Sequence, residues 1–197
     1  MLPGLRYEFY PVFGKTFAEI VKSAEENGPI DKRTGRRTTS VFEWAIGWSY
    51  EFTYQMEYEE EDDKLHCSIS LYDVSLLFDI TITLPVLTDD SSLNAIEKEL
   101  WRGYIANILK AEHGRVKIVR DDARDDILRR LDAMDYLVLD AEQEADAEDL
   151  VARYVREQTA RGGRDAVRQI GERLDHYEEE VRKAAGKAPG RRERKVR

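Results

Sequence analysis

Strict two-residue alternation from Val41 to Glu59 constrains the fold of this chain more than any other feature. Bulky apolar residues occupy every second position, and polar or small residues lie between them. Because side chains alternate between the two faces of a β-strand, the pattern predicts a long strand with one buried face. At ~3.3 Å per residue such a strand spans more than ~50 Å, so we expect it to bend or break, most easily at Gly47. The apolar positions are Phe42, Trp44, Ile46, Trp48, Tyr50, Phe52, Tyr54, Met56 and Tyr58.

More strands are expected on both sides of this segment. The acidic stretch EEEDDK (59–64) predicts a turn, and alternation resumes after it, which predicts further antiparallel strands. YEFYPVFG (7–14) predicts an edge strand, because Pro11 has no N–H to donate to a neighbouring strand. We expect the face that carries Trp44 and Trp48 to form the main core between sheet and helices. The later alternating positions are Leu65, Cys67, Ile69 and Leu71, followed by Ile80, Ile82 and Leu84.

Helical patterns account for the rest of the chain. KTFAEIVKSAEENGP (15–29) predicts a short helix that ends at Asn27-Gly28-Pro29. From Ser92 to Met134 apolar residues recur at steps of three and four, and residues 141–160 form an acidic helical stretch. Strands first and helices afterwards indicate an α+β fold.

The C-terminal region divides into a helix and a tail. The pair Gly162-Gly163 is expected to separate the acidic stretch from a last amphipathic helix, whose seam covers only about two and a half heptads. Docking of this helix on its own domain is favoured over dimerisation. We therefore expect a domain at 1–160, a helix at 161–186 and a basic disordered tail at 187–197. The seam consists of Val167, Ile170, Leu174, Tyr177, Val181 and Ala184.

Composition and charge narrow the class of protein. The 197 residues are 42% hydrophobic, which is enough for one globular domain with an appendage. The net charge is −9, but residues 182–197 carry eight basic residues and one glutamate, or +7, which leaves −16 on residues 1–181. The acidic body is expected to repel nucleic acid, and only the tail could contact an anionic partner. A monomer or weak dimer is expected.

The sequence contains no recognisable targeting signal or common catalytic motif. MLPGLRYEFYPVF lacks the features of a signal peptide, and no stretch approaches the ~20 apolar residues of a membrane span. We expect a cytoplasmic protein, or a secreted one if a leader before Met1 has been removed. The lone Cys67 excludes an intramolecular disulfide and has the pattern of a core residue rather than a nucleophile. No serine-hydrolase elbow or phosphate-binding loop occurs.

A carboxylate interrupts the apolar stripe of the predicted helix around residues 101–127. On a helical wheel at ~100° per residue, six apolar residues lie within about 40° of Glu112, so it is at the centre of the buried arc. A buried carboxylate needs a partner, a proton or a cavity. Glu112 is either in a structural ion pair, for instance with Arg115, or directed into a functional site. The six residues are Trp101, Ile105, Ile108, Val116, Val119 and Ala123.

The chain resembles a bacterial family of predicted secreted zinc-dependent proteases. The resemblance extends from about Tyr7 to about Ala166. It rests on the order and spacing of YEFYPVFGKTFAEI, NGP, FEWAIGWSYEF, CSISLYDVSLLFDITITLP and LWRGYIANILKAEHGRV. It implies a zincin-like fold, with an antiparallel sheet followed by a long active-site helix and C-terminal helices.

The resemblance also implies a catalytic site that has lost its metal. The family's helix carries H-E-x-G-H, in which two histidines bind zinc and the glutamate activates water. Here the glutamate matches Glu112, but the histidine positions are Ala111 and Arg115, and the third ligand position falls on Arg161. A guanidinium does not bind zinc. The resemblance therefore implies a vestigial Glu112 and no zinc cofactor, with Arg115 and Arg161 supplying positive charge near the carboxylate.

Three functions follow as hypotheses. The first is a non-catalytic member of the protease family that binds a peptide or protein partner. The second is an active hydrolase with a non-standard site, for which His66, His113 and His176 with Glu112 are the available imidazole set. The third is an interaction protein that acts through its C-terminal helix and basic tail.

Overall fold

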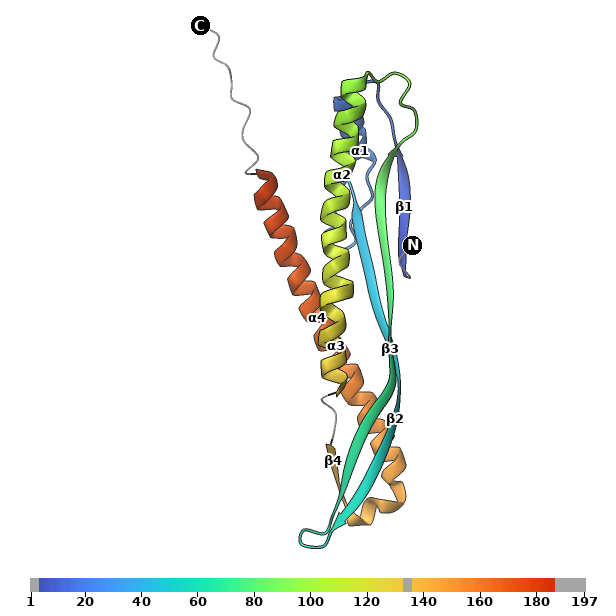
Figure 1. The fold of residues 1–197 in the computed structure, drawn as a ribbon, viewed down its shortest axis with the longest axis vertical. Coiled ribbons are helices and arrows are strands. Elements are labelled where there is room, and N and C mark those ends of the chain that lie inside the picture. The colour runs from blue at the N-terminus through green and yellow to red at the C-terminus, as the bar shows by residue number, and fades with distance from the viewer. Residues whose placement is uncertain (1–3, 133–135, 187–197) are drawn as a thin grey trace.

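Two long strands form the central element of the fold, β2 (Val41–Glu59) and β3 (Lys64–Leu87). The computed structural model describes residues 4–132 and 136–186. Figure 1 shows an elongated molecule in which this strand pair runs most of its length, with α2 and α3 alongside it. The other elements are β1 (Leu5–Val12), α1 (Phe17–Asn27), α2 (Ala95–Lys117), the π-turn η1 (Ile118–Asp122), α3 (Ala123–Asp132), β4 (Tyr136–Asp140), the 3₁₀ turn η2 (Ala141–Asp146) and α4 (Ala147–Gly186).

The strand predicted at 41–59 has the bounds that alternation gives, but it does not break at Gly47. The irregularity falls slightly later: Ser49 pairs with Ser75 and Glu51 pairs with Tyr72, so β3 has one more residue than β2 in this interval. This is a β-bulge, and Asp73 within it has a positive φ of 50°. The bulge also explains why the apolar positions of β3 change from odd to even numbers. The segment after the turn is therefore one strand rather than several.

The sheet is mixed, which corrects the expectation of an antiparallel sheet. β1 pairs with β3 in parallel, from Leu5 opposite Ile80 to Val12 opposite Leu87, and it forms the predicted edge. β4 pairs antiparallel with the first residues of β3, Lys64 to Ser68. Because β1 and β4 flank different halves of β3, the sheet has three strands at each end. Local periodicity does not indicate β4, which has only five residues.

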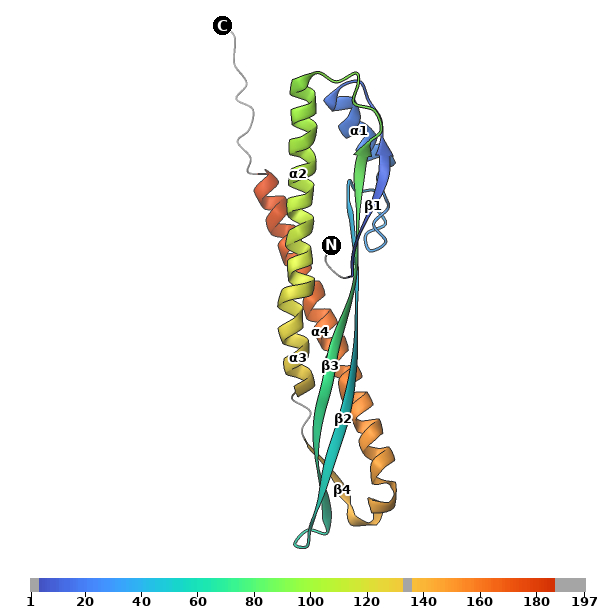
Figure 2. The ribbon, with the colours of Figure 1, turned by 45° about the vertical axis from the view of Figure 1, so that its right-hand side comes forward.

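The helices confirm an α+β fold and correct one boundary. α2 begins with a capping box between Asn94 and Glu97, and the π-turn joins it to α3. α4 continues through Gly162 and Gly163 without interruption, so the expected separation of two helices there is wrong. The domain boundary drawn at residue 160 lies inside this helix. The two views in Figures 1 and 2 show α4 crossing the molecule obliquely, from the hairpin end to the middle of α2.

Two apolar clusters hold α2, α3 and α4 to the sheet, and a third packs α1 against β1. One joins Ile80 and Ile82 of β3 to α2, α3 and α4, with Trp44 packed against it as expected. Ile170 and Leu174 belong to this cluster, so the C-terminal seam docks on its own domain. The other surrounds Cys67, which is fully buried. The tail at 187–197 and Met134 lie outside the described residues. In the part of the chain that the structure describes, no helix is long and apolar enough to cross a membrane.

Candidate functional site

Glu112 is buried in the middle of the fold, as its place in the apolar stripe predicts. Only 1% of its surface is exposed. Ser40, in the loop before β2, donates a hydrogen bond from Oγ to Glu112 Oε1 at 2.6 Å. One face of α2 thus carries a carboxylate between the apolar side chains of Ile108 and Val116. Leaving this group without partners would cost several kcal/mol, so its contacts determine the character of the site.

Arg115 is the main partner of Glu112. Its Nη1 donates to both carboxylate oxygens at 2.9 Å, and its side chain is 19% exposed. The two residues are three positions apart on α2, a spacing that brings side chains together on one helix face. The ion pair that the sequence left as one alternative is therefore present in the structure.

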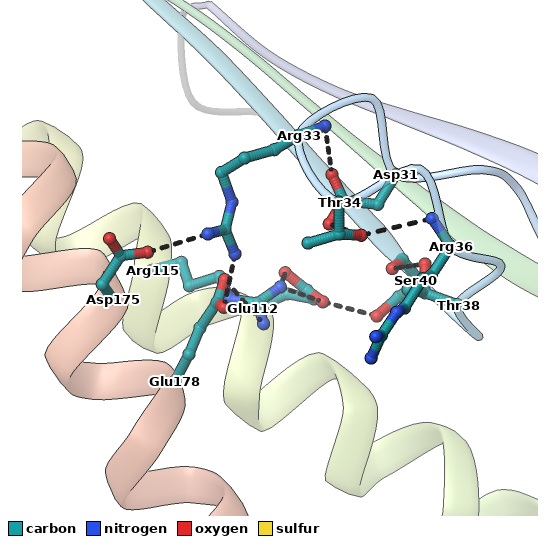
Figure 3. Close-up of polar contacts among 10 residues, drawn as sticks. All are labelled: Asp31, Arg33, Thr34, Arg36, Thr38, Ser40, Glu112, Arg115, Asp175 and Glu178. Carbon is teal, nitrogen blue, oxygen red and sulfur yellow. Dashed lines mark hydrogen bonds and ion pairs between the residues drawn. The ribbon is translucent and has the colours of Figure 1, made fainter.

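The ion pair extends to α4 and to the loop before β2 (Figure 3). Arg115 Nη2 lies 3.4 Å from Glu178 Oε1, and Arg33 Nη2 donates to Glu178 Oε2 at 2.9 Å. Arg33 Nη1 also lies 3.1 Å from Asp175 Oδ1. Charges alternate along this chain of contacts, which joins three segments far apart in sequence. The arrangement fixes α4 beside α2 at this level.

The loop at 28–40 is shaped by its own hydrogen bonds. The Asp31 carboxylate accepts bonds from the Arg33 amide and the Thr34 hydroxyl, each at 2.8 Å. Burial opposes the ionised carboxylate of Asp31, but these hydrogen bonds outweigh it and lower its pKa. Gly35 turns the chain at φ 68°, and its amide donates to the Asp31 carbonyl. The turn holds Arg33 in position to reach α4.

A cavity of about 730 Å³ lies between this loop, the start of β2 and the helices α2 and α4. Both Arg115 and Glu178 line it, so it leads to the buried ion pair. Six cationic side chains and four carboxylates line the cavity, an excess of two positive charges. The cations are Lys32, Arg33, Arg36, Arg37, Arg115 and Arg182, and the carboxylates are Asp31, Glu43, Asp175 and Glu178.

The structure brings together only some of the residues singled out by sequence. Ala111 and Arg115 flank Glu112 on α2. Arg161 is exposed and lies roughly 25 Å along α4 from Glu178, at ~1.5 Å per residue. Arg161 therefore does not supply charge to Glu112. The positive charge beyond Arg115 comes from Arg33, which the sequence did not single out.

The three histidines lie in separate places. His113 Nε2 lies 2.9 Å from the Tyr7 hydroxyl of β1, on another side of α2 from the loop that contacts Glu112. His176 is exposed on α4 beside Glu180. His66 lies near the β2–β3 turn, beside Glu59. The imidazole set weighed for a hydrolase therefore does not converge on Glu112.

The residues around Glu112 do not fit a zinc ion. Ala111 has no donor atom, and the guanidinium of Arg115 contacts both oxygens of Glu112. Among residues 4–132 and 136–186, the one group of three potential metal ligands is Glu59, Asp62 and His66. That group lies at the far end of β2, roughly 60 Å from Ser40 at ~3.3 Å per residue. Its carboxylates are exposed.

Ser40, Arg33, Asp175 and Glu178 complete the site, and sequence analysis missed all four. Ser40 precedes the long strand, and Arg33 lies in a loop with no regular period. Glu178 and Asp175 are on the polar side of the C-terminal heptad seam, where acidic residues usually face solvent. The only available signal was that a buried Glu112 needs partners. It did not indicate which segments supply them.

Comparison with known proteins places the chain in a family. A family model with the description "Bacterial protein of unknown function (DUF922)" matches residues 7–164, well over half of the 197 residues. The match covers the sheet, α2 and the first part of α4, and so includes Ser40, Glu112 and Arg115. No curated protein and no solved structure matches the chain significantly. The chain belongs to DUF922, a family of bacterial proteins of unknown function.

Proposed function

We propose that this protein is a non-catalytic member of a zincin-like protease family and that it binds a peptide segment of a partner protein. The observation that carries the proposal is the contact of Arg115 Nη1 with both oxygens of Glu112 at 2.9 Å. A general base must accept a proton from water or substrate, and this carboxylate is instead held by a guanidinium and the Ser40 hydroxyl. The group that would do the chemistry has a structural role.

The surroundings of the pair support peptide binding. The cavity of about 730 Å³ is within the range of ligand sites in proteins. Val41 to Trp44, the first residues of β2, line it, and within the described residues the outer edge of β2 has no strand partner. An extended peptide can add to such an edge through main-chain hydrogen bonds and insert side chains into an adjacent pocket. Binding of this kind needs no metal.

The binding part of the proposal can be tested with peptides selected without bias. A random decapeptide phage library is panned on the full-length chain, and the enriched peptides are synthesised and measured by fluorescence anisotropy. Gly171 lines the cavity, and a Cβ there meets no atom within 4 Å, so Gly171→Phe fills the cavity without disturbing the helix. Gly103 on α2 is equally open, lies outside this cavity and supplies the matched variant Gly103→Phe. We expect Gly171→Phe to abolish binding and Gly103→Phe to leave it unchanged.

The non-catalytic part needs a metal measurement. We expect elemental analysis of protein purified without a His tag to find far less than one equivalent of zinc, and chelators to leave the melting temperature unchanged. Near-stoichiometric zinc that is lost in Glu112→Gln would refute this part of the proposal. Peptide hydrolysis that is lost in the same variant would support the alternative of a hydrolase with a non-standard site.

A further inference from the structure

One edge of the Arg115 guanidinium has no hydrogen bond. Nη1 makes both bonds to Glu112, whereas Nε is buried and has no hydrogen-bond partner among the described residues. Nη2 is 3.4 Å from Glu178 Oε1, within ion-pair distance but without a hydrogen bond. The Nε–Nη2 edge is the one that pairs with planar carboxylates through two parallel bonds. A buried donor without a partner is costly, so this edge favours an acceptor.

Glu178 is a weak occupant of this position. It lies between Arg115 and Arg33 and makes its one hydrogen bond, at 2.9 Å, to Arg33. Arg33 is 59% exposed, and exposed ion pairs contribute little to stability. Glu178 is on the polar face of α4, so its side chain can turn toward solvent without exposing the core. An incoming carboxylate could therefore take its place between the two guanidinium groups.

Two further cations at the cavity have neither a hydrogen-bond nor an ion-pair partner for their guanidinium groups among the described residues. These are Arg36, in the loop, and Arg182, on α4. The other cations have partners: Lys32 is paired with Glu43 at 2.7 Å, and Arg37 donates to the Gly28 carbonyl. The cavity thus concentrates positive charge on a body whose residues 1–181 carry a net charge of −16. Such a charge contrast guides an anionic group to one place on the surface.

We propose that the cavity binds a carboxylate of an acidic peptide, which pairs with the Nε–Nη2 edge of Arg115 and with Arg33. This inference rests on the proposed function and names the class of its ligand. Arg36 and Arg182 contact further acidic groups at the entrance. A peptide is favoured over a nucleic acid because the acidic body repels an extended polyanion, whereas a short segment contacts only the basic cavity. The carboxylate comes from an Asp or Glu side chain or from a C-terminus.

The test uses defined peptides at physiological salt. Fluorescein-labelled octapeptides of alternating Glu and Thr are compared with octapeptides of alternating Gln and Thr by anisotropy, each as free acid and as amide. We expect the Glu peptide to bind at least about tenfold more tightly, because one desolvated charge-assisted pair is worth about 1.4 kcal/mol or more. A preference that persists in the amides identifies side-chain carboxylates. A preference of both peptides for the free acid identifies the C-terminus.

Single-residue variants then show which arginines contact the Glu peptide. We expect Arg36→Ala and Arg182→Ala each to weaken binding of the Glu peptide about threefold to tenfold, whereas Arg161→Ala, an exposed arginine elsewhere on α4, has no effect. Arg115→Lys keeps the charge but removes the two-bond edge, and it should weaken binding further. Glu178→Gln removes the competing carboxylate and should strengthen binding. If Glu178 only stabilises the fold, Glu178→Gln will lower the melting temperature and leave the affinity for the Glu peptide unchanged.

The outcomes separate this inference from the proposed function. If Glu and Gln peptides bind equally and neither prefers the free acid to the amide, while phage-selected peptides still bind only when the cavity is unfilled, the carboxylate assignment is wrong and peptide binding stands. If Arg36→Ala, Arg182→Ala and Arg161→Ala all weaken the Glu peptide to the same degree, its binding reflects overall charge, and the assignment is again wrong. If no peptide of either set binds, both proposals are wrong.

Discussion

Gly163 of α4 lies directly against the indole ring of Trp48 on β2. A Cβ at residue 163 would lie 1.9 Å from Trp48 Cη2 and 2.0 Å from Cζ2, closer than atoms can approach. The absence of a side chain therefore allows α4 to pack on the aromatic face of the sheet. A glycine pair that suggests a helix break by propensity here serves close packing instead.

This contact gives a first prediction. Gly163→Ala should lower the free energy of unfolding by about 1–3 kcal/mol, because the ring is rigid and α4 must shift to admit the methyl group. The neighbouring Gly162 provides the control, since a Cβ there meets only Arg130 Cβ, at an ordinary 3.7 Å. Gly162→Ala should raise stability by up to about 1 kcal/mol through helix propensity. Urea denaturation of both variants measures the difference. Equal changes in the free energy of unfolding would show that the Trp48 ring moves aside without cost.

The strands could be predicted because their signal is local. At 41–59 the polarity of each residue indicates which face of the strand it occupies, and the observed β2 has the same bounds. The change from odd to even apolar positions between Leu71 and Ile80 is also visible in the sequence. Whether it marks two strands or one bulged strand depends on pairing with β2, which is a long-range property. The same applies to β4, whose five residues form a strand only because β3 offers an edge.

The site could be predicted only at its centre. Burial of Glu112 follows from helical periodicity, and Arg115 follows from three-residue spacing. Arg33, Asp175 and Glu178 come from a loop and from the far end of α4, so nothing local relates them to α2. The position of Arg161 relative to Glu112 could not be predicted for a related reason. The expectation assumed that this segment of α4 returns to Glu112, whereas the helix continues straight through residues 162 and 163 and reaches α2 only near Glu178.

The β-bulge gives a second prediction. Asp73 has φ 50°, a region that Asp adopts at moderate cost and that β-branched residues avoid. Asp73→Val should therefore lower the free energy of unfolding by roughly 1–2 kcal/mol, although valine favours strands elsewhere. Ser70→Val, at an exposed position of β3 with an ordinary backbone, is the control and should be neutral or stabilising. Thermal melts should show a lower melting temperature for Asp73→Val and no decrease for Ser70→Val, and an equal loss in both would mean that the valine side chain, not the backbone, is responsible.

The Asp31 turn gives a third prediction, which concerns pH. Hydrogen bonds from Thr34 and from the Arg33 amide outweigh burial and lower the pKa of Asp31 below its ordinary value of 3.8. A carboxylate with a lowered pKa in the folded state stabilises the fold above its unfolded pKa, and this contribution is lost as pH falls through the folded pKa. The Arg33 amide proton, which donates to Asp31, should shift in NMR spectra with a midpoint below pH 3.8. A midpoint at or above that value would show that the turn does not favour the ionised form. Asp31→Asn should remove the transition.

The fourth prediction concerns the coupling of Arg115 and Glu112. Because Glu112 is buried and Nη1 bonds both of its oxygens, Arg115→Ala leaves an uncompensated carboxylate and should cost roughly 3 kcal/mol of unfolding free energy. Glu112→Gln retains a hydrogen-bonding group and should cost less. In a double-mutant cycle the coupling should lie well above the ~0.5 kcal/mol of a surface helix pair. Glu19 on α1 and Arg102 on α2 are exposed and do not pair with each other, since Arg102 lies beside Glu99, so they provide a reference cycle with coupling near zero. Coupling near zero for Arg115 and Glu112 as well would mean that the guanidinium does not hold the carboxylate, and Glu112 would again be available for chemistry.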